Sequence, residues 1–114
     1  MDSMKFRYPA EKFAAARSIL MLPHPEGEVQ ALASAFSECD LGLHDISDDM
    51  LDDSARHWVE TVNRTMDTTG IAEDEITGTY YRKAETLTVE EIFEFSKSVD
   101  ELACWFEMRF YSDS

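Results

Sequence analysis

Apolar residues recur at helical spacing in four separate stretches of the chain, which predicts four α-helices. Their ranges are 9–22, 26–43, 53–69 and 88–111. In each range, apolar side chains fall three or four positions apart, the spacing that lines one face of a helix with 3.6 residues per turn. Because such faces must be buried against one another, the sequence predicts an all-α fold, an antiparallel four-helix bundle.

The first two predicted helices have readable starts and stops. Pro9 suits a first helical turn, where no backbone N–H is needed for a helical bond, and Pro23 stops the helix. Glu26 and Glu28 favour the positive end of the second helix dipole. Gly42 weakens the last turn, so this helix is expected to end near position 40 or to run on to position 44.

The third helix has the clearest signals at both ends. Asp52 or Asp53 can cap its start, and Gly70 suits the left-handed position after a helix, where the missing Cβ removes a steric penalty. Between them one stripe of apolar residues faces the core: Ala55, Trp58, Val59, Val62 and Met66.

The fourth helix is the longest, and a capping box precedes it. Thr88 and Glu91 can each hydrogen-bond to the backbone N–H of the other, and Leu87 can pack on Ile92. A continuous stripe then runs along one side of the helix: Ile92, Phe95, Val99, Leu102, Ala103, Phe106 and Phe110. We expect this helix to form the spine of the core.

The segment 72–87 has no clear period. It opens with the acidic run 73–75 and continues with strand-like residues around Gly78, ending at Tyr80 and Tyr81. We expect a long irregular segment or a short hairpin here, with an extended crossover or an added helical turn as alternatives. Loops of this length in compact domains are often functional.

Length and charge narrow the range of functions. The 114 residues suit a single domain, 1–114, and they carry 24 acids against 10 bases, a net charge of −14. Positions 23–60 alone hold ten acids and one base, which is a net charge of −9. Direct nucleic-acid binding and attachment to an acidic membrane are therefore disfavoured, whereas a basic protein partner would be attracted. High net charge also serves solubility.

The sequence contains few signals for a cellular compartment or a cofactor. No apolar run is long enough to span a membrane, and the start of the chain lacks a signal-peptide core. Two cysteines, Cys39 and Cys104, do not make a disulfide scaffold, and no glycine-rich phosphate loop is present. We therefore expect a cytoplasmic protein with reduced thiols, without a cofactor and without catalytic residues readable from motifs.

Two sets of residues were considered as metal ligands. His24, His44 and His57 lie on separate elements without partners at ligand spacing. From Asp45 onward, oxygen-bearing side chains follow the calcium-loop spacing, but Met50 replaces the required glycine and Arg56 the bidentate glutamate. Capping of the third helix is the simpler role for these aspartates, so no metal site is predicted, although a weak divalent-ion site outside the EF-hand class stays open.

The fourth helix also carries a second apolar strip, roughly opposite its core stripe. Phe93, Cys104, Met108 and Tyr111 share this side, with Lys97 and Asp100 interrupting it and Trp105 on its flank. A helix that is apolar on two sides is either central in its fold or packs against another chain. We predict that Phe93, Trp105, Met108 and Tyr111 bind a protein partner, most simply in a symmetric homodimer. The alternative is that Tyr80 and Tyr81, or the segment 4–8, cover the strip within one chain.

Three functions follow as hypotheses. The leading one is a non-enzymatic, acidic helical interaction or regulatory module that self-associates. The second is an acidic decoy or inhibitor that occupies the groove of a nucleic-acid-binding protein. The third is an enzyme or ligand carrier whose site assembles from scattered residues such as His44, His57 and nearby aspartates.

Overall fold

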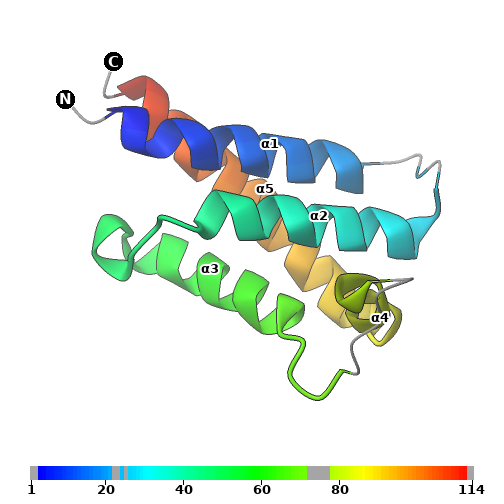
Figure 1. Ribbon diagram of the computed structural model, residues 1–114. Helices are drawn as coiled ribbons and strands as arrows, with labels where there is room; N and C mark the ends of the chain where they lie inside the picture. The colour runs from blue at the N-terminus through cyan, green and yellow to red at the C-terminus, as the bar shows by residue number, and fades with distance from the viewer. Residues whose placement is uncertain (1–2, 22–23, 25, 72–77, 113–114) are drawn as a thin grey trace.

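The computed structural model describes residues 3–21, 24, 26–71 and 78–112, and in these ranges the chain is helical with no strand. Two short 3₁₀ turns, η1 and η2, accompany five α-helices (Figure 1). In chain order the elements are η1 (Ser3–Phe6), α1 (Arg7–Leu20), α2 (Glu28–Leu43), η2 (Asp48–Met50), α3 (Asp53–Met66), α4 (Thr79–Glu85) and α5 (Val89–Ser112). The predicted all-α class is confirmed, but the count of four helices is wrong, because α4 adds a fifth.

Helix α5 crosses behind α2 in Figure 1 and packs mainly against α1, α3 and η1. Helices α1 and α2 lie side by side and antiparallel, α5 contacts both α1 and α3, and α4 packs against α2. Helix α1 also runs antiparallel to α5, so the described ends of the chain lie close together. In the part of the chain that the structure describes, no helix has the length and apolarity needed to cross a bilayer.

Four fully buried phenylalanines hold this arrangement together. The ring of Phe106 on α5 lies 5.3 Å from that of Phe13 on α1, and the ring of Phe95, about three turns earlier on α5, lies 5.0 Å from that of Phe36 on α2. Edge-to-face and tilted pairs at these distances suit the charge distribution of aromatic rings. Both pairs use the predicted core stripe of α5, which confirms that this helix is the spine.

The first helix is shifted toward the N-terminus relative to its predicted range, 9–22. It begins at Arg7, so Pro9 is its third residue, still within the turn where a missing N–H costs no helical bond. It ends at Leu20, and Met21 is already extended. The predicted stop at Pro23 falls outside the described residues.

The second and third helices also differ from their predicted ranges at one end each. Helix α2 starts at Glu28, two residues later than predicted, after Gly27 with φ 95°. Helix α3 ends at Met66 rather than at position 69, because Asp67 accepts a bond from the backbone N–H of Thr69 at 2.9 Å and turns the chain. Gly70 does have a positive φ of 85°, but in this following turn rather than at the helix end.

Of the alternatives for 72–87, the structure supports the added helical turn and not an irregular or hairpin segment, as far as it describes these residues. Residues Thr79–Glu85 form helix α4, which begins after Gly78 with φ 97°. Tyr80 packs edge-to-face on the buried Phe36, 5.5 Å between ring centres, and Ala84 is buried. This tertiary contact overrides the strand preference of the tyrosines. The stretch 72–77 lies outside the described residues.

Gly42 lets the first two helices approach closely. A Cβ added there would lie 3.0 Å from the Cβ of Lys12 and 3.1 Å from the ring of Phe13. Neither atom can move easily, because the first is fixed to the backbone of α1 and the second belongs to a fully buried ring. The glycine that weakens the helix in the sequence is therefore required by packing.

We expect Gly42→Ala to lower the free energy of unfolding by about 1 kcal/mol. Overpacking costs about 1–3 kcal/mol, and the gain of about 1 kcal/mol in helix propensity offsets only part of it. Urea denaturation followed by circular dichroism measures the difference. Ser37→Ala, at an exposed position of the same helix, is the control and should be neutral or slightly stabilising. A Gly42→Ala protein more stable than the parent would show that α1 and α2 are not held at this separation.

Candidate interaction surface

The start of α5 is set by the capping box that the sequence predicts. The backbone N–H of Thr88 donates to the Glu91 carboxylate at 2.8 Å, and the backbone N–H of Glu91 donates to the Thr88 hydroxyl at 3.1 Å. These bonds satisfy two backbone donors that have no partner within the helix. The hydrogen bond from Thr88 holds the pKa of Glu91 below its usual range. With its start and its core stripe set, the side of α5 that points outward is determined as well.

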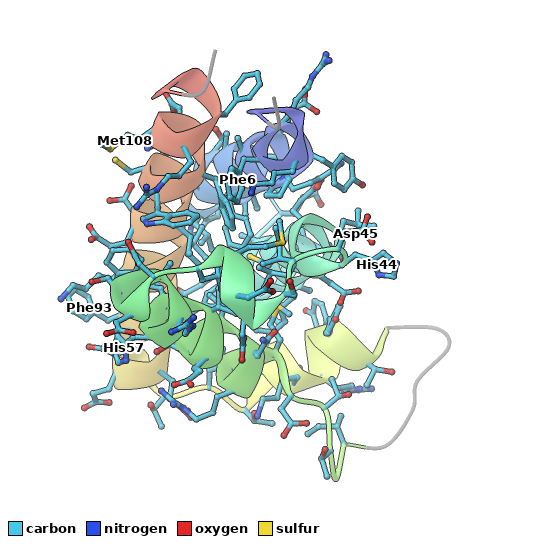
Figure 2. The ribbon with its side chains drawn as sticks, turned by 90° about the vertical axis from the view of Figure 1, so that its left-hand side faces the viewer. Phe6, His44, Asp45, His57, Phe93 and Met108 are labelled. Carbon is cyan, nitrogen blue, oxygen red and sulfur yellow. The ribbon has the colours of Figure 1, made fainter. Side chains whose placement is uncertain are left out.

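Large apolar side chains lie exposed on the outward side of α5. Phe93 is 63% exposed, Met108 is 65% exposed, and Val89 in the first turn is 79% exposed. Figure 2 shows Phe93 and Met108 projecting from the same side of the helix, away from the body of the protein. Val89 is an addition to the predicted set. Sequence reasoning missed it because it stands just after the cap, outside the apolar strip of the helix interior.

Cys104 lies on this same outward side and contacts Met108. The two sulfur atoms are 3.7 Å apart, and the thiol is exposed. The other thiol, Cys39, is buried on α2, where loss of hydration raises its pKa above the ordinary range. The two cysteines are therefore chemically unlike each other, and only Cys104 belongs to the outward side of α5.

Trp105, which the sequence places on the flank of the apolar strip, makes several contacts within the chain. It is half-buried, its ring meets Phe6 of η1 edge-on at 5.6 Å, and the Arg109 guanidinium lies over it at 4.6 Å. Its indole N–H donates to Asp52 at 3.1 Å. The alternative prediction is that the segment 4–8 covers the apolar strip. This is the case for Trp105, because Phe6 of that segment packs against its ring.

Phe93 and Met108 are not covered in this way. Tyr80, the other residue considered as a cover, packs against Phe36 on the α2 side of the core instead. Of the four predicted partner-binding residues, Phe93 and Met108 are thus open to solvent, while Trp105 is engaged within the chain. The side chain of Tyr111 lies outside the described residues.

Asp52 joins the start of α3 to the last turns of α5. One carboxylate oxygen accepts the backbone N–H of Ala55 at 2.9 Å as the helix cap. The other accepts Trp105 and Arg109, each at 3.1 Å. The bond from Ala55 and, next, the bond from the Trp105 indole hold the pKa of Asp52 below its usual range. Sequence reasoning identified the cap but not the bond to α5, which spans 53 positions.

A groove runs between α1 and α5 beside the outward side of α5. Its volume is about 450 Å³. The small side chains of Ala10 and Ala14 leave room along α1, and Phe110 contributes a half-buried ring from α5. The remaining lining is charged: Arg7, Glu11 and Glu107. No sequence pattern could reveal this groove, because it depends on how two helices at opposite ends of the chain meet.

The aspartates of 45–53 are used in turns, caps and ion pairs. Asp52 caps α3, Asp53 pairs with Arg56 at 3.2 Å, and the Arg56 Nε–H also donates to the carbonyl oxygen of Asp48 at 3.0 Å. The predicted capping role is confirmed for Asp52. Within the described ranges, no group of three or more His, Cys, Asp or Glu residues is placed to hold a metal ion.

The histidines do not come together. His24 hydrogen-bonds to the carbonyl oxygen of Leu20 at 2.9 Å. Figure 2 shows His44 and Asp45 on one side of the molecule and His57 on the opposite side, below Phe93. His57 therefore lies apart from His44 and Asp45, the residues proposed with it as an example of a scattered site.

Comparison with known protein families, with curated proteins and with solved structures finds no match to this chain.

Replacing Asp52 tests the junction between α3 and α5. We expect Asp52→Ala to lower the free energy of unfolding at pH 7 by about 1–2 kcal/mol, the usual loss for a removed N-cap. Because the pKa is lowered on folding, the contribution is complete above the ordinary aspartate pKa of about 4 and disappears as the pH falls below it. The stability difference from the parent should therefore shrink between about pH 5 and pH 2 in urea titrations.

Asp53→Ala is the matched control for this prediction. Asp53 is fully exposed and pairs with Arg56 on its own helix, so its removal should change stability by less than about 0.5 kcal/mol. A stability difference for Asp52→Ala that stays constant down to pH 2 would show that the charge of Asp52 plays no part in the junction.

Proposed function

We propose that the protein is a non-enzymatic interaction module that self-associates through the outward side of α5. The observation that carries this proposal is the exposure of Phe93 and Met108 on one side of a helix whose opposite side is fully buried. Aromatic residues and methionine are enriched at the centres of protein interfaces and depleted elsewhere on surfaces. Two such side chains on one helix, with Val89 beside them, are better explained by contact with another chain than by the needs of this fold.

The energy available from this surface is sufficient for a reversible complex. Complete burial of a Phe or Met side chain contributes about 1.5–3 kcal/mol each. In a symmetric dimer each side chain is buried twice, once on each copy. Both side chains are already partly buried, and part of the gain offsets the entropy of association, so the proposed complex is weak and reversible.

A second candidate is the acidic decoy, and a separate observation favours it. The connection between α2 and α3 exposes Asp45, Asp48, Asp49 and Asp53 to solvent, with Arg56 the only base between α2 and the middle of α3. Such a surface would attract a basic protein. The two candidates differ in the sign of their salt dependence: binding to a basic partner weakens with salt, whereas self-association of a chain with net charge −14 strengthens.

Sedimentation velocity over a micromolar to submillimolar range tests self-association. We expect the parent protein to change from the mass of one chain to that of two as its concentration rises, at lower concentration in high salt. Phe93→Glu should raise the dimer dissociation constant about tenfold or more, because it removes apolar burial and adds a negative charge to an acidic protein.

Leu41→Glu is the matched control. It introduces the same charge at a partly exposed apolar position of a helix, but on α2. Its dissociation constant should stay near that of the parent, provided that thermal denaturation shows a folded protein. A parent protein with the mass of one chain at every concentration and salt contradicts self-association, and so does an equal effect of the two substitutions.

A further inference from the structure

The outward side of α5 continues across the groove onto α1. Phe93 and Glu107 are 14 residues apart on α5, so they point within about 40° of each other and lie about 21 Å apart along the helix axis. Glu107 lines the groove together with Ala10, Ala14 and Phe110. One broad face therefore carries an exposed phenylalanine near one end and a groove near the other.

The groove is large enough to receive that phenylalanine from another copy. A cavity of about 150 Å³ is sufficient to hold a benzene ring, and the groove volume is about 450 Å³. Its apolar part, formed by Ala10, Ala14 and Phe110, matches the chemistry of a phenyl ring. Within one chain, the separation of about 21 Å prevents Phe93 from reaching the groove.

The charge on this face also suits a second copy. Its bases are Arg7, Arg17 and Lys97, and its acids are Glu11, Glu90, Asp100, Glu101 and Glu107. Three positive charges stand against five negative ones, a small part of the net charge of −14 that the whole chain carries. Arg7 pairs with Glu11 at 3.5 Å, and Arg17 of α1 pairs with Asp100 of α5 at 3.6 Å. The negative excess on this face is small and part of it is paired, so an identical face meets less repulsion here than at the acidic connection between α2 and α3.

We propose that a second copy of this chain docks antiparallel on the α1/α5 face, with Phe93 of each copy seated in the groove of the other. This inference rests on the self-association proposed above and specifies its geometry. In a two-fold arrangement the contact between Phe93 and the groove occurs twice, which is the self-complementarity that a symmetric dimer requires.

The register follows from the positions on α5. Placing Phe93 opposite Met108 of the second copy puts the two-fold axis between positions 100 and 101, so that residue i faces residue 201 − i. Glu107 and the groove then lie beside the incoming phenyl ring. Lys97 comes to lie opposite position 104 of the second copy, one turn from that copy's Asp100 and Glu101, so opposite charges meet near the axis.

A parallel dimer through the same face would make less favourable contacts. It would place each residue opposite itself, with Phe93 against Phe93, Lys97 against Lys97 and Glu107 against Glu107. Like charges would then face each other along the helix, and both grooves would be left without an apolar occupant. The antiparallel arrangement avoids both costs.

Cysteine cross-linking distinguishes the arrangements. In a Cys104→Ser background, one variant carries Phe93→Cys and a second carries Ala14→Cys, and the two are mixed under mild oxidation. We expect the mixed disulfide between the two variants to form at least about tenfold faster than the disulfide between two copies of the Phe93→Cys variant. Leu41→Cys, on α2, replaces Ala14→Cys as the matched control and should not cross-link above background. Sedimentation velocity of the Cys104→Ser protein establishes that the background itself dimerises.

Each outcome is decisive. A predominant mixed disulfide supports the antiparallel dimer in which Phe93 of each copy lies in the groove of the other. A dimer that cross-links through two copies of Phe93→Cys, or one that gives neither product, overturns this geometry and leaves self-association standing. A Cys104→Ser protein and a parent protein that both keep the mass of one chain overturn the geometry and the proposed function together.

Discussion

Burial of one side of α5 is the constraint on which the rest of the structure depends. Phe95 and Phe106 are fully buried on this side, one against Phe36 of α2 and the other against Phe13 of α1. Since the two rings are eleven residues apart on a rigid helix, they set the positions of two different helices at once. These contacts fix the rotation of α5 about its axis. Phe93 and Met108 must therefore lie on the side that faces outward.

The Asp52 junction has a second effect on that outward side. By accepting the Trp105 indole N–H and the Arg109 guanidinium, Asp52 holds both residues toward α3. Tryptophan is among the residues that most often dominate the binding energy of a protein interface. The Trp105 ring instead contacts Phe6 of the same chain. The exposed surface is consequently smaller than the apolar strip of the sequence, and it continues toward α1 rather than toward α3.

The distribution of charge separates two regions of the surface. Acids dominate α2, the turn that follows it and the start of α3, whereas bases and acids alternate on the α1/α5 face. Long-range repulsion between two copies is least where the local net charge is small, and salt screens it elsewhere. The proposed self-association uses the face with the smaller charge excess, while the acidic remainder of the surface would keep the protein dispersed.

Local patterns in the sequence were sufficient for four of the five described helices and for the outward side of α5. The capping box at Thr88 and Glu91, the cap at Asp52 and the stripe through Phe95 and Phe106 depend on residues three or four positions apart, and all are present in the structure. Helix α4, the bond from Trp105 to Asp52 and the α1/α5 groove were decided by tertiary structure alone. Each of them joins residues tens of positions apart, and no period in a sequence specifies which distant surfaces will meet.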